Sequence, residues 1–210
     1  MTAPPSASGR IRVLLADDEN LIREALAQML DLEDDLEVVA QAASGPEAVA
    51  AAVHTGVDVA VLDLQMPDLD GIAVAERLAR DLPACGTVIV TSHGRPGHLK
   101  RALAAGVRGF LPKTTSAATL ARVVRTVHEG GRYVDPDLAT EAIAAGDSPL
   151  TPREADVLEL AADGAPVDEI AARASLSPGT VRNYLSSAVT KLGAANRHDA
   201  CAVARRMGWI

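Results

Sequence analysis

Five side chains in the first part of the chain have the types that phosphoryl chemistry requires. They are the carboxylates of Asp17, Asp18 and Asp63, the hydroxyl of Thr91 and the ammonium group of Lys113. Carboxylates held close together repel one another unless a hard divalent cation neutralises them, and oxygen ligands with several retained waters suit Mg²⁺. With the cation in place, Asp63 can attack a phosphoryl group and form an acyl phosphate. Lys113 and Thr91 can then offer a charge and a hydrogen bond to the phosphoryl oxygens.

The hydrophobic pattern of the first 130 residues predicts a fold that positions these groups. Short apolar runs alternate with helical patterns in five rounds, which is typical of βαβ units around a parallel sheet. The expected strands, all apolar enough to be buried on both faces, are residues 11–16, 36–40, 57–62, 87–91 and 109–111. The expected helices, the last with Ser116 as its N-cap, are residues 20–31, 45–55, 70–80, 96–105 and 116–129.

The candidate residues stand at the carboxyl ends of these strands, which is where ligands bind in an open parallel sheet. Asp17 and Asp18 follow the first strand, and Asp63 follows the third. Thr91 ends the fourth strand, and Lys113 comes just after the fifth. We therefore expect three carboxylates, a hydroxyl and an ammonium group to meet at one edge of the sheet.

Several segments of this part of the chain resemble the receiver domain of response regulators, over residues 10–128. They are Leu-Leu-Ala-Asp-Asp-Glu at 14–19, Val-Leu-Asp-Leu-Gln-Met-Pro at 61–67 with Asp70-Gly71, Thr91-Ser92, and Gly-Phe-Leu-Pro-Lys at 109–113. The resemblance implies a flavodoxin-like (βα)5 fold with a doubly wound parallel sheet. It also implies that a sensor histidine kinase is the phosphate donor.

The same resemblance assigns roles to individual residues. It implies Asp63 as the phosphoacceptor. The Mg²⁺ ligands that it implies are Asp18, Asp63, the backbone carbonyl of Gln65, and Asp17 acting directly or through water. It implies Thr91, Phe110 and Lys113 as the residues that change conformation when the phosphate is present.

Turn signals between residues 129 and 147 predict a linker, and the pattern after it is wholly helical. Thr151, Pro152 and Glu154 form the sequence of a capping box, which predicts a helix from there to about residue 163. Further helices are expected near 167–174, 178–191 and 196–207. Residues 148–210 therefore indicate an all-α domain of four helices. Its helices at 167–174 and 178–191 fit a helix-turn-helix. In this motif the later of the two helices, here 178–191, enters the major groove of DNA.

The helix expected at 178–191 has an apolar stripe and a polar outer face. The polar side chains that would point outward are Thr180, Arg182, Asn183, Ser186, Ser187 and Lys191. Arginine and asparagine are suited to reading the edges of guanine and adenine, whereas Lys191 and the serines suit phosphates. A polar outer face is usually only a solvated face, so this feature by itself leaves DNA binding open.

A second resemblance covers residues 147–208. Leu-Thr-Pro-Arg-Glu at 150–154, Glu-Ile-Ala at 169–171, Leu-Ser-Pro-Gly-Thr-Val-Arg-Asn at 176–183 and Lys-Leu-Gly at 191–193 resemble the DNA-binding domain of the NarL/LuxR class, the NarL/FixJ family of response regulators. The segment Arg-Asn-Tyr-Leu-Ser at 182–186 and the ending Gly-Trp-Ile at 208–210 look most like its DesR-type branch. The resemblance implies base contacts by Arg182 and Asn183, with Ser186 as a weaker candidate. It also implies that two chains pair through the last helix, near 195–204, after phosphorylation.

Charge is distributed unevenly along the chain. The formal net charge of −8 argues, taken alone, against a nucleic-acid-binding protein. Residues 1–147 hold 13 basic and 21 acidic side chains, whereas residues 148–210 hold seven of each. From residue 171 onward, the chain contains six basic side chains and only one acidic side chain, that of Asp199. A basic surface at the C-terminal end is therefore compatible with DNA binding.

The remaining features place few demands on function. No apolar run approaches the roughly 20 residues of a membrane span, and residues 1–9 lack the pattern of a signal peptide. We expect a cytoplasmic protein with a short disordered lead at residues 1–9. Cys85 and Cys201 lie far apart without metal-ligand spacing, so we expect ordinary thiols.

The leading hypothesis is a two-component response regulator that acts as a transcription factor and is not an enzyme. Phosphorylation of Asp63 by a partner histidine kinase would promote dimerisation and binding to double-stranded promoter DNA. One alternative is a constitutive DNA-binding protein whose first domain only binds other proteins. Another is an aspartyl-phosphate hydrolase, but the sequence after Asp63 offers neither a nearby general acid nor a substrate-capping insertion.

Overall fold

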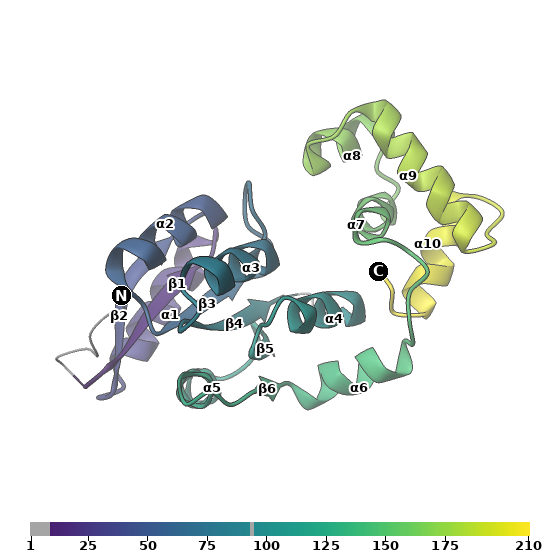
Figure 1. The fold of residues 1–210 in the computed structure, drawn as a ribbon. Coiled ribbons are helices and arrows are strands. Elements are labelled where there is room, and N and C mark those ends of the chain that lie inside the picture. The colour runs from purple at the N-terminus through teal and green to yellow at the C-terminus, as the bar shows by residue number, and fades with distance from the viewer. Residues whose placement is uncertain (1–8, 93–94) are drawn as a thin grey trace. The chain divides into compact units, whose positions relative to one another are not determined.

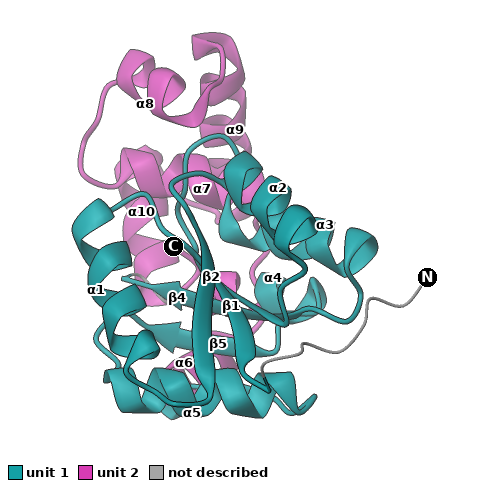
Figure 2. Cartoon of the chain, turned by 90° about the vertical axis from the view of Figure 1, so that its left-hand side faces the viewer, with its two compact units in different colours: residues 1–94, 101–136 teal, residues 95–100, 137–210 magenta. Residues whose placement is uncertain are grey.

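The structure is a computed structural model that describes residues 9–92 and 95–210. Most of the lead expected at residues 1–9 thus lies outside the described residues. The chain divides into two compact units, residues 1–94 with 101–136 and residues 95–100 with 137–210 (Figure 2). Among the described residues, no helix combines the length and the apolar character that a membrane crossing requires.

The first unit is built on a parallel sheet whose strands follow the order β2-β1-β3-β4-β5-β6 (Figure 1). The strands are β1 (Ile11–Ala16), β2 (Leu36–Ala42), β3 (Val59–Asp63), β4 (Gly86–Thr91), β5 (Gly109–Pro112) and β6 (Tyr133–Val134). The predicted α/β fold class is confirmed. The order reverses direction between β1 and β3, and in open α/β sheets ligands bind at the carboxyl ends of the strands beside such a reversal.

Helices cover both faces of this sheet (Figures 1 and 2). They are α1 (Asn20–Asp31), α2 (Gly45–Thr55), α3 (Gly71–Asp81) and α5 (Ala117–His128). The helix α4 (Pro96–Ala104) is divided between the two units, with residues 96–100 in the second. Alternate side chains of the central strands, among them Val13, Val61 and Val88, pack with α1 and α5 in one buried cluster. Every residue of β3 and β4 is buried, and this burial on both faces explains the near-continuous apolar composition of these central strands.

Two strands depart from the prediction. β2 was expected to be buried on both faces, which is wrong: the residues between Leu36 and Ala42 are half-buried or exposed. The reason is that β2 lies at the edge of the sheet, where the helices cover it incompletely. β6 was not predicted, and it lies within the segment expected as a linker. It pairs with β5 through Gly109 and Phe110, and its two residues are too short for a periodic sequence signal.

The second unit is helical. Its helices are α6 (Pro136–Ala144), α7 (Pro152–Ala161), α8 (Val167–Ala174), α9 (Pro178–Lys191) and α10 (Arg197–Arg206). The predicted capping box is present at the start of α7, where the side chains of Thr151 and Glu154 each accept a hydrogen bond from the other's backbone N–H. Leu158, Ile170, Val181 and Ala204 pack with other apolar side chains in a core separate from that of the sheet.

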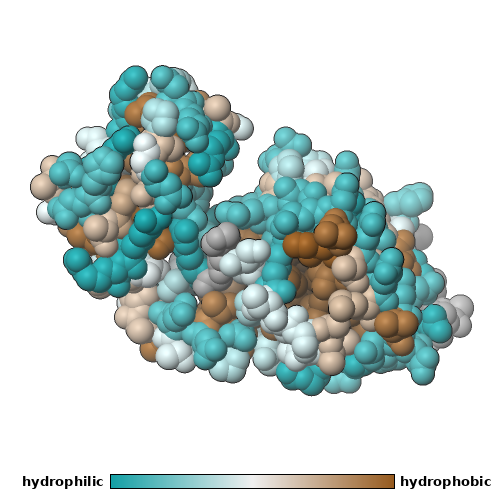
Figure 3. Space-filling view, turned by 180° about the vertical axis from the view of Figure 1, so that it is seen from behind, coloured by the Kyte–Doolittle hydropathy of each residue, from teal (hydrophilic) through white to brown (hydrophobic). Residues whose placement is uncertain are grey.

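The surface carries apolar side chains in patches among hydrophilic ones (Figure 3). Leu21 and Leu32 at the two ends of α1 are 80% and 84% exposed, and Ile143 of α6 is 82% exposed. Single exposed apolar side chains are common on folded proteins and need no functional explanation.

Candidate functional site

The sheet brings the three predicted carboxylates together. Asp17 follows β1 directly, and Asp63 is the last residue of β3, the strand paired with β1. Asp17, Asp18 and Asp63 each offer a carboxylate oxygen, and these oxygens lie within 4.8 Å of one another. Asp17 and Asp63 are only 4% and 6% exposed, whereas Asp18 is exposed. An oxygen-only donor set that is open on one side fits a hard divalent cation that keeps part of its hydration shell.

Lys113 lies over this cluster. Its Nζ is 2.8 Å from Asp17 Oδ2, 2.9 Å from Glu19 Oε1 and 3.5 Å from Asp63 Oδ1. Its side chain is 10% exposed, so the ammonium group is largely withdrawn from water. The Lys113 backbone N–H donates to the Thr91 carbonyl at 2.8 Å, which fixes this residue beside the end of β4.

Glu19 belongs to this site although it was not among the predicted site residues. Its carboxylate pairs with Lys113, which is 94 positions away in the sequence. Its backbone N–H donates to Asp17 Oδ1 at 2.9 Å, so that it also orients one of the predicted carboxylates. The signal available in the sequence was its place directly after Asp17 and Asp18. However, an exposed acid in a loop is commonplace, and only the fold reveals its partner.

Burial and neighbouring charges shift the pKa values in this site. Loss of hydration raises the pKa of Asp63 to about 6; the neighbouring Asp17 charge adds to the rise, and Lys113 opposes it. Burial alone would lower the pKa of Lys113, but hydrogen bonds from its ammonium group to Asp17 and Glu19 dominate and raise it. Lys113 is therefore fully charged near neutral pH, and the Asp63 carboxylate is less stabilised than an exposed one.

Thr91 and Phe110, the other two residues implied to change conformation on phosphorylation, lie inside the sheet. Thr91 is the last residue of β4 and is 1% exposed, and Phe110 of β5 is fully buried. Thr91 pairs with Pro112, and Phe110 pairs with Ile89. Gln65, the other metal ligand implied by resemblance, is exposed in the loop that follows β3.

The loop after Asp63 is held by close backbone packing. Asp70 caps α3 by accepting from the Ala73 N–H at 2.7 Å. A Cβ atom placed on Gly71 would lie 2.2 Å from the Asp63 carbonyl oxygen, a distance that no side chain tolerates. Glycine at this position therefore lets the start of α3 approach the backbone of the candidate phosphoacceptor.

The helix-turn-helix is formed by α8 and α9. The turn begins at Ser175, which adopts a left-handed conformation with φ of 54°, and Ser177 caps α9 by accepting from the Thr180 N–H at 3.1 Å. Ile170 of α8 and Val181 of α9 are fully buried. The two helices are therefore joined by a short ordered turn and held together by apolar contacts.

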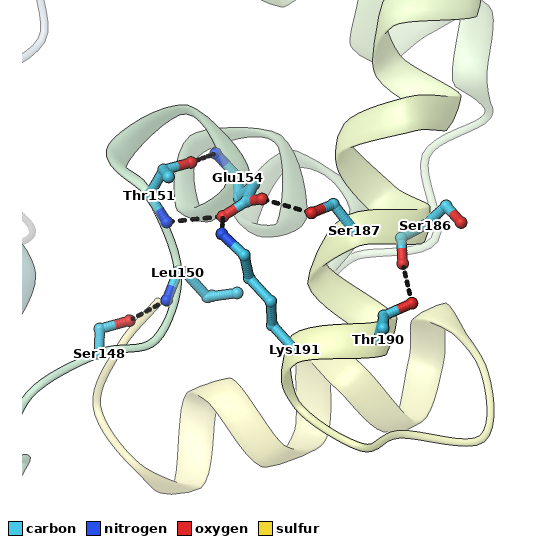
Figure 4. Close-up of polar contacts among 8 residues, drawn as sticks. All are labelled: Ser148, Leu150, Thr151, Glu154, Ser186, Ser187, Thr190 and Lys191. Atoms are coloured by element: carbon cyan, nitrogen blue, oxygen red, sulfur yellow. Dashed lines mark hydrogen bonds and ion pairs between the residues drawn. The ribbon is translucent and has the colours of Figure 1, made fainter.

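The predicted DNA-contact residues differ in exposure and in their partners. Arg182, Asn183 and Ser186 are exposed on α9. Thr180 is half-buried, and its hydroxyl lies 2.8 Å from that of Ser177. Lys191 is directed elsewhere, because its Nζ lies 2.7 Å from Glu154 Oε2 on α7. Figure 4 shows Lys191 and Ser187 directed toward Glu154, while Ser186 points away from it.

Fold and sites together define the class of protein. A parallel sheet with acidic residues at its carboxyl edge, followed by a helix-turn-helix, is the arrangement of a receiver joined to a DNA-binding unit. Residues 13–125 match the response regulator receiver domain, and residues 148–204 match the luxR family of bacterial regulatory proteins. The chain belongs to the LuxR/NarL class of response regulators. It is thus a two-component response regulator and a DNA-binding transcription factor. Its family is one of transcription factors and not of enzymes.

Similarity to named regulators extends over nearly the whole chain. The chain is 40% identical over 200 residues to the transcriptional regulatory protein DesR of Bacillus subtilis, covering 95% of this chain and 99% of DesR. It is 41% identical over 201 residues to UhpA of Escherichia coli, covering 95% of this chain and 100% of UhpA.

Solved structures show the same architecture. The response regulator ChrA of a heme-sensing two-component system is 32% identical, with a TM-score of 0.57, and the match covers 96% of this chain and 100% of ChrA. RcsB solved in complex with DNA has a TM-score of 0.62 at 23% identity, covering 93% of this chain and 98% of RcsB. At that identity the RcsB match supports the fold alone.

Proposed function

We propose that a sensor histidine kinase phosphorylates Asp63 and that this modification controls binding of the C-terminal unit to promoter DNA. The observation that carries the proposal is the meeting of Asp17, Asp18, Asp63 and Lys113 at one edge of the sheet. The domains that take part are a receiver at residues 10–128, a linker at 129–147 and a DNA-binding domain at 148–210. The protein would act in the cytoplasm, where kinase and DNA are accessible.

Asp17, Asp18 and Asp63, with the Gln65 carbonyl, would hold Mg²⁺. The cation, when bound, supplies positive charge that offsets the repulsion between these carboxylates and an incoming phosphoryl group. The Asp63 carboxylate is the nucleophile, and its burial keeps it poorly hydrated. One of its oxygens would form the new O–P bond while the P–N bond to the histidine of the kinase breaks and the imidazole leaves. Lys113 would exchange its contact with Asp63 for a phosphoryl oxygen.

Thr91 and Phe110 would transmit the modification. Thr91 lies at the end of the strand next to that of Asp63 and carries a hydroxyl that can donate to a phosphoryl oxygen. A movement of Thr91 toward the phosphate would free space for the ring of Phe110 on the neighbouring strand. The surface of the receiver would change as a result, and two chains would then pair.

Arg182, Asn183 and Ser186 would read DNA from the exposed face of α9, with Thr180 as a further candidate. Lys191, which was also predicted to contact DNA, is paired with Glu154 instead. Arginine and asparagine can form bidentate contacts with guanine and adenine. A single unit with few basic side chains binds weakly, so pairing of two units on adjacent half-sites would supply the missing affinity.

The proposal is tested by replacing the candidate phosphoacceptor. Wild-type protein incubated with ³²P-labelled acetyl phosphate and Mg²⁺ is expected to take up label with a stoichiometry approaching one, whereas Asp63→Asn takes up none. Asp68→Asn is the matched control, because Asp68 is an exposed acid on the same loop. Its φ of 66° is a conformation that asparagine tolerates.

Two results would contradict the proposal. Equal labelling of Asp63→Asn would place the phosphate on another residue. Unlabelled wild-type protein that still binds promoter DNA would make the first unit a protein-binding module and the DNA binding constitutive.

A further inference from the structure

Glu154 is a buried carboxylate that links α7 to the recognition helix α9. It is 4% exposed, and among the described residues of the helical unit it is the only buried charged residue. We propose that Glu154, with Ser187 and Lys191, is a positioning group that sets the rotation of α9 about its axis. Lys191 then acts through Glu154 and does not contact a DNA phosphate. This inference rests on the proposed DNA-reading role of α9.

The carboxylate receives hydrogen bonds from three directions (Figure 4). Oε1 accepts from the Ser187 hydroxyl at 2.6 Å. Oε2 accepts from Lys191 Nζ at 2.7 Å and from the Thr151 backbone N–H at 2.6 Å. One side chain therefore caps α7 and holds two residues of α9 at the same time.

The two α9 residues are placed where they resist rotation. Ser187 and Lys191 are four positions apart, so they lie on one stripe of the helix. This stripe runs beside the buried one that contains Val181, Leu185 and Ala188. Apolar packing is non-directional and tolerates small rotations, whereas hydrogen bonds weaken steeply when their angles change. The hydrogen bonds to Glu154 thus fix the rotation of α9 about its axis, which the apolar core alone would leave adjustable.

Rotation of α9 matters because base contacts depend on it. Asn183 and Ser186 are exposed on the face of α9 away from its buried stripe, and Arg182 is exposed beside them. A bidentate contact with a base edge requires both hydrogen bonds to be aligned, so a small rotation would lose discrimination between bases before it lost phosphate contacts.

Charge pairing explains why the group is stable in the interior. Burial alone would raise the pKa of Glu154, but the hydrogen bonds from Lys191 and Ser187 outweigh it and lower that pKa to about 2. The Lys191 side chain is 36% exposed, so its stem reaches the surface while its ammonium group meets the carboxylate. A DNA phosphate would have to separate this pair and leave Glu154 buried without its partner, which is costly.

The test compares Lys191→Gln, Glu154→Gln and the double variant in the phosphorylated full-length protein. The probes are a duplex selected by wild-type protein from a random library and a shuffled duplex of the same composition. Affinity for each duplex is measured over a range of salt concentrations. Fluorescence of Trp209, the single tryptophan of the chain, which packs on the core of the helical unit, reports whether each variant is folded.

A positioning role predicts a specific pattern. Lys191→Gln is expected to lower the ratio of selected to shuffled affinity about tenfold, as loss of a hydrogen bond to a charged group would. The slope of log affinity against log salt should stay unchanged, because no phosphate contact is lost. The double variant should recover much of the ratio, because two neutral amides leave no charge unpaired. Ser187→Ala, which unpairs no charge, should show the same pattern at smaller size even if Lys191→Gln folds poorly.

Other outcomes overturn the inference in distinguishable ways. If Lys191 contacts a phosphate, Lys191→Gln weakens both duplexes equally, the salt slope falls by about 0.9, and the double variant recovers nothing. If every variant discriminates like the wild type, the network does not set the rotation. If wild-type protein enriches no duplex from the library, the proposed DNA reading itself has failed, and the inference fails with it.

Discussion

At the acidic edge of the sheet, three carboxylates share one ammonium group. Lys113 Nζ lies within 3.5 Å of Asp17, Glu19 and Asp63. A phosphoryl group on Asp63 would bring further negative oxygens to the same cation. The carboxylate of Glu19 therefore competes for the charge that the phosphoryl group needs.

Glu19→Gln is expected to speed phosphorylation of Asp63 by acetyl phosphate. The substitution removes a negative charge beside Lys113, so repulsion of the incoming dianion falls and the ammonium group is less restrained. Because the Glu19 side chain is 57% exposed and screened by water, we expect a modest gain, about two- to fivefold in initial rate. The measurement is the rate of ³²P uptake at fixed Mg²⁺. Glu24→Gln, an exposed acid further along α1, is the control, and a slower reaction in Glu19→Gln would show that Glu19 assists the chemistry.

Among the elements, the junction of β3 and α3 leaves no room for a side chain at Gly71. Gly71→Ala would force its Cβ against the Asp63 carbonyl oxygen and within 3.1 Å of Ile89 Cδ1. We expect the free energy of unfolding of the first unit to fall by about 1–3 kcal/mol, as overpacking usually costs. Urea unfolding followed by circular dichroism measures this loss.

Gly179→Ala is the matched control for that prediction. Gly179 is in the first turn of α9, and its added Cβ would meet only Ser177 Oγ, at 3.8 Å. Alanine has a higher helix propensity than glycine, so the free energy of unfolding of the helical unit should stay equal or rise by about 0.5–1 kcal/mol. A Gly71→Ala protein as stable as wild type would mean that α3 can shift away from β3 without cost.

The contact between α7 and α9 predicts an acid dependence. The pKa of Glu154 is about 2 in the folded protein, against an ordinary value of 4.5. An acid whose pKa is lowered by folding adds stability that is fully present above the unfolded value and is lost as pH falls toward the folded value. The helical unit should therefore become less stable between about pH 5 and pH 2.

Trp209 fluorescence during denaturant unfolding measures this loss. The drop in unfolding free energy from neutral to acid pH should be smaller in Glu154→Gln, which has no carboxylate to protonate. An identical drop in both proteins would assign the acid dependence of the helical unit to other groups.

At the scale of the whole molecule, the acidic side chains lie mainly before residue 148, and the DNA-binding domain has no net charge. A domain without an excess of basic groups gains little from phosphate contacts, so the proposed pairing would supply most of its affinity. We predict that acetyl phosphate strengthens binding of the full-length protein to a duplex with two half-sites by at least about tenfold through effective concentration.

A duplex with a single half-site provides the control for pairing. Binding to it should change little on phosphorylation, and Asp63→Asn should respond on neither duplex. Fluorescence anisotropy at fixed salt distinguishes the two duplexes. An equal gain on both would mean that phosphorylation improves each DNA-binding unit individually and that pairing is not the source.

Local sequence determined most of the fold and the centre of the acidic site. The apolar runs predicted five of the six strands and every helix of the helix-turn-helix, because burial on a sheet or along a helix imposes a period. Asp17, Asp18 and Asp63 could be placed together because parallel strands end at a common edge. The capping box at Thr151 and Glu154 followed from spacing alone, because both partners lie within one turn.

Only the tertiary structure decided the partners of long side chains. Glu19 meets Lys113 across 94 positions, and Glu154 meets Lys191 across 37. The polar pattern of α9 indicated that Lys191 faces solvent, yet its ammonium group is directed to α7. The position of a residue on a helix follows from periodicity, but the direction of a flexible side chain depends on which charges the packing brings within reach. β6 could not be predicted from the sequence either, because a strand of two residues forms only where the fold brings it beside β5.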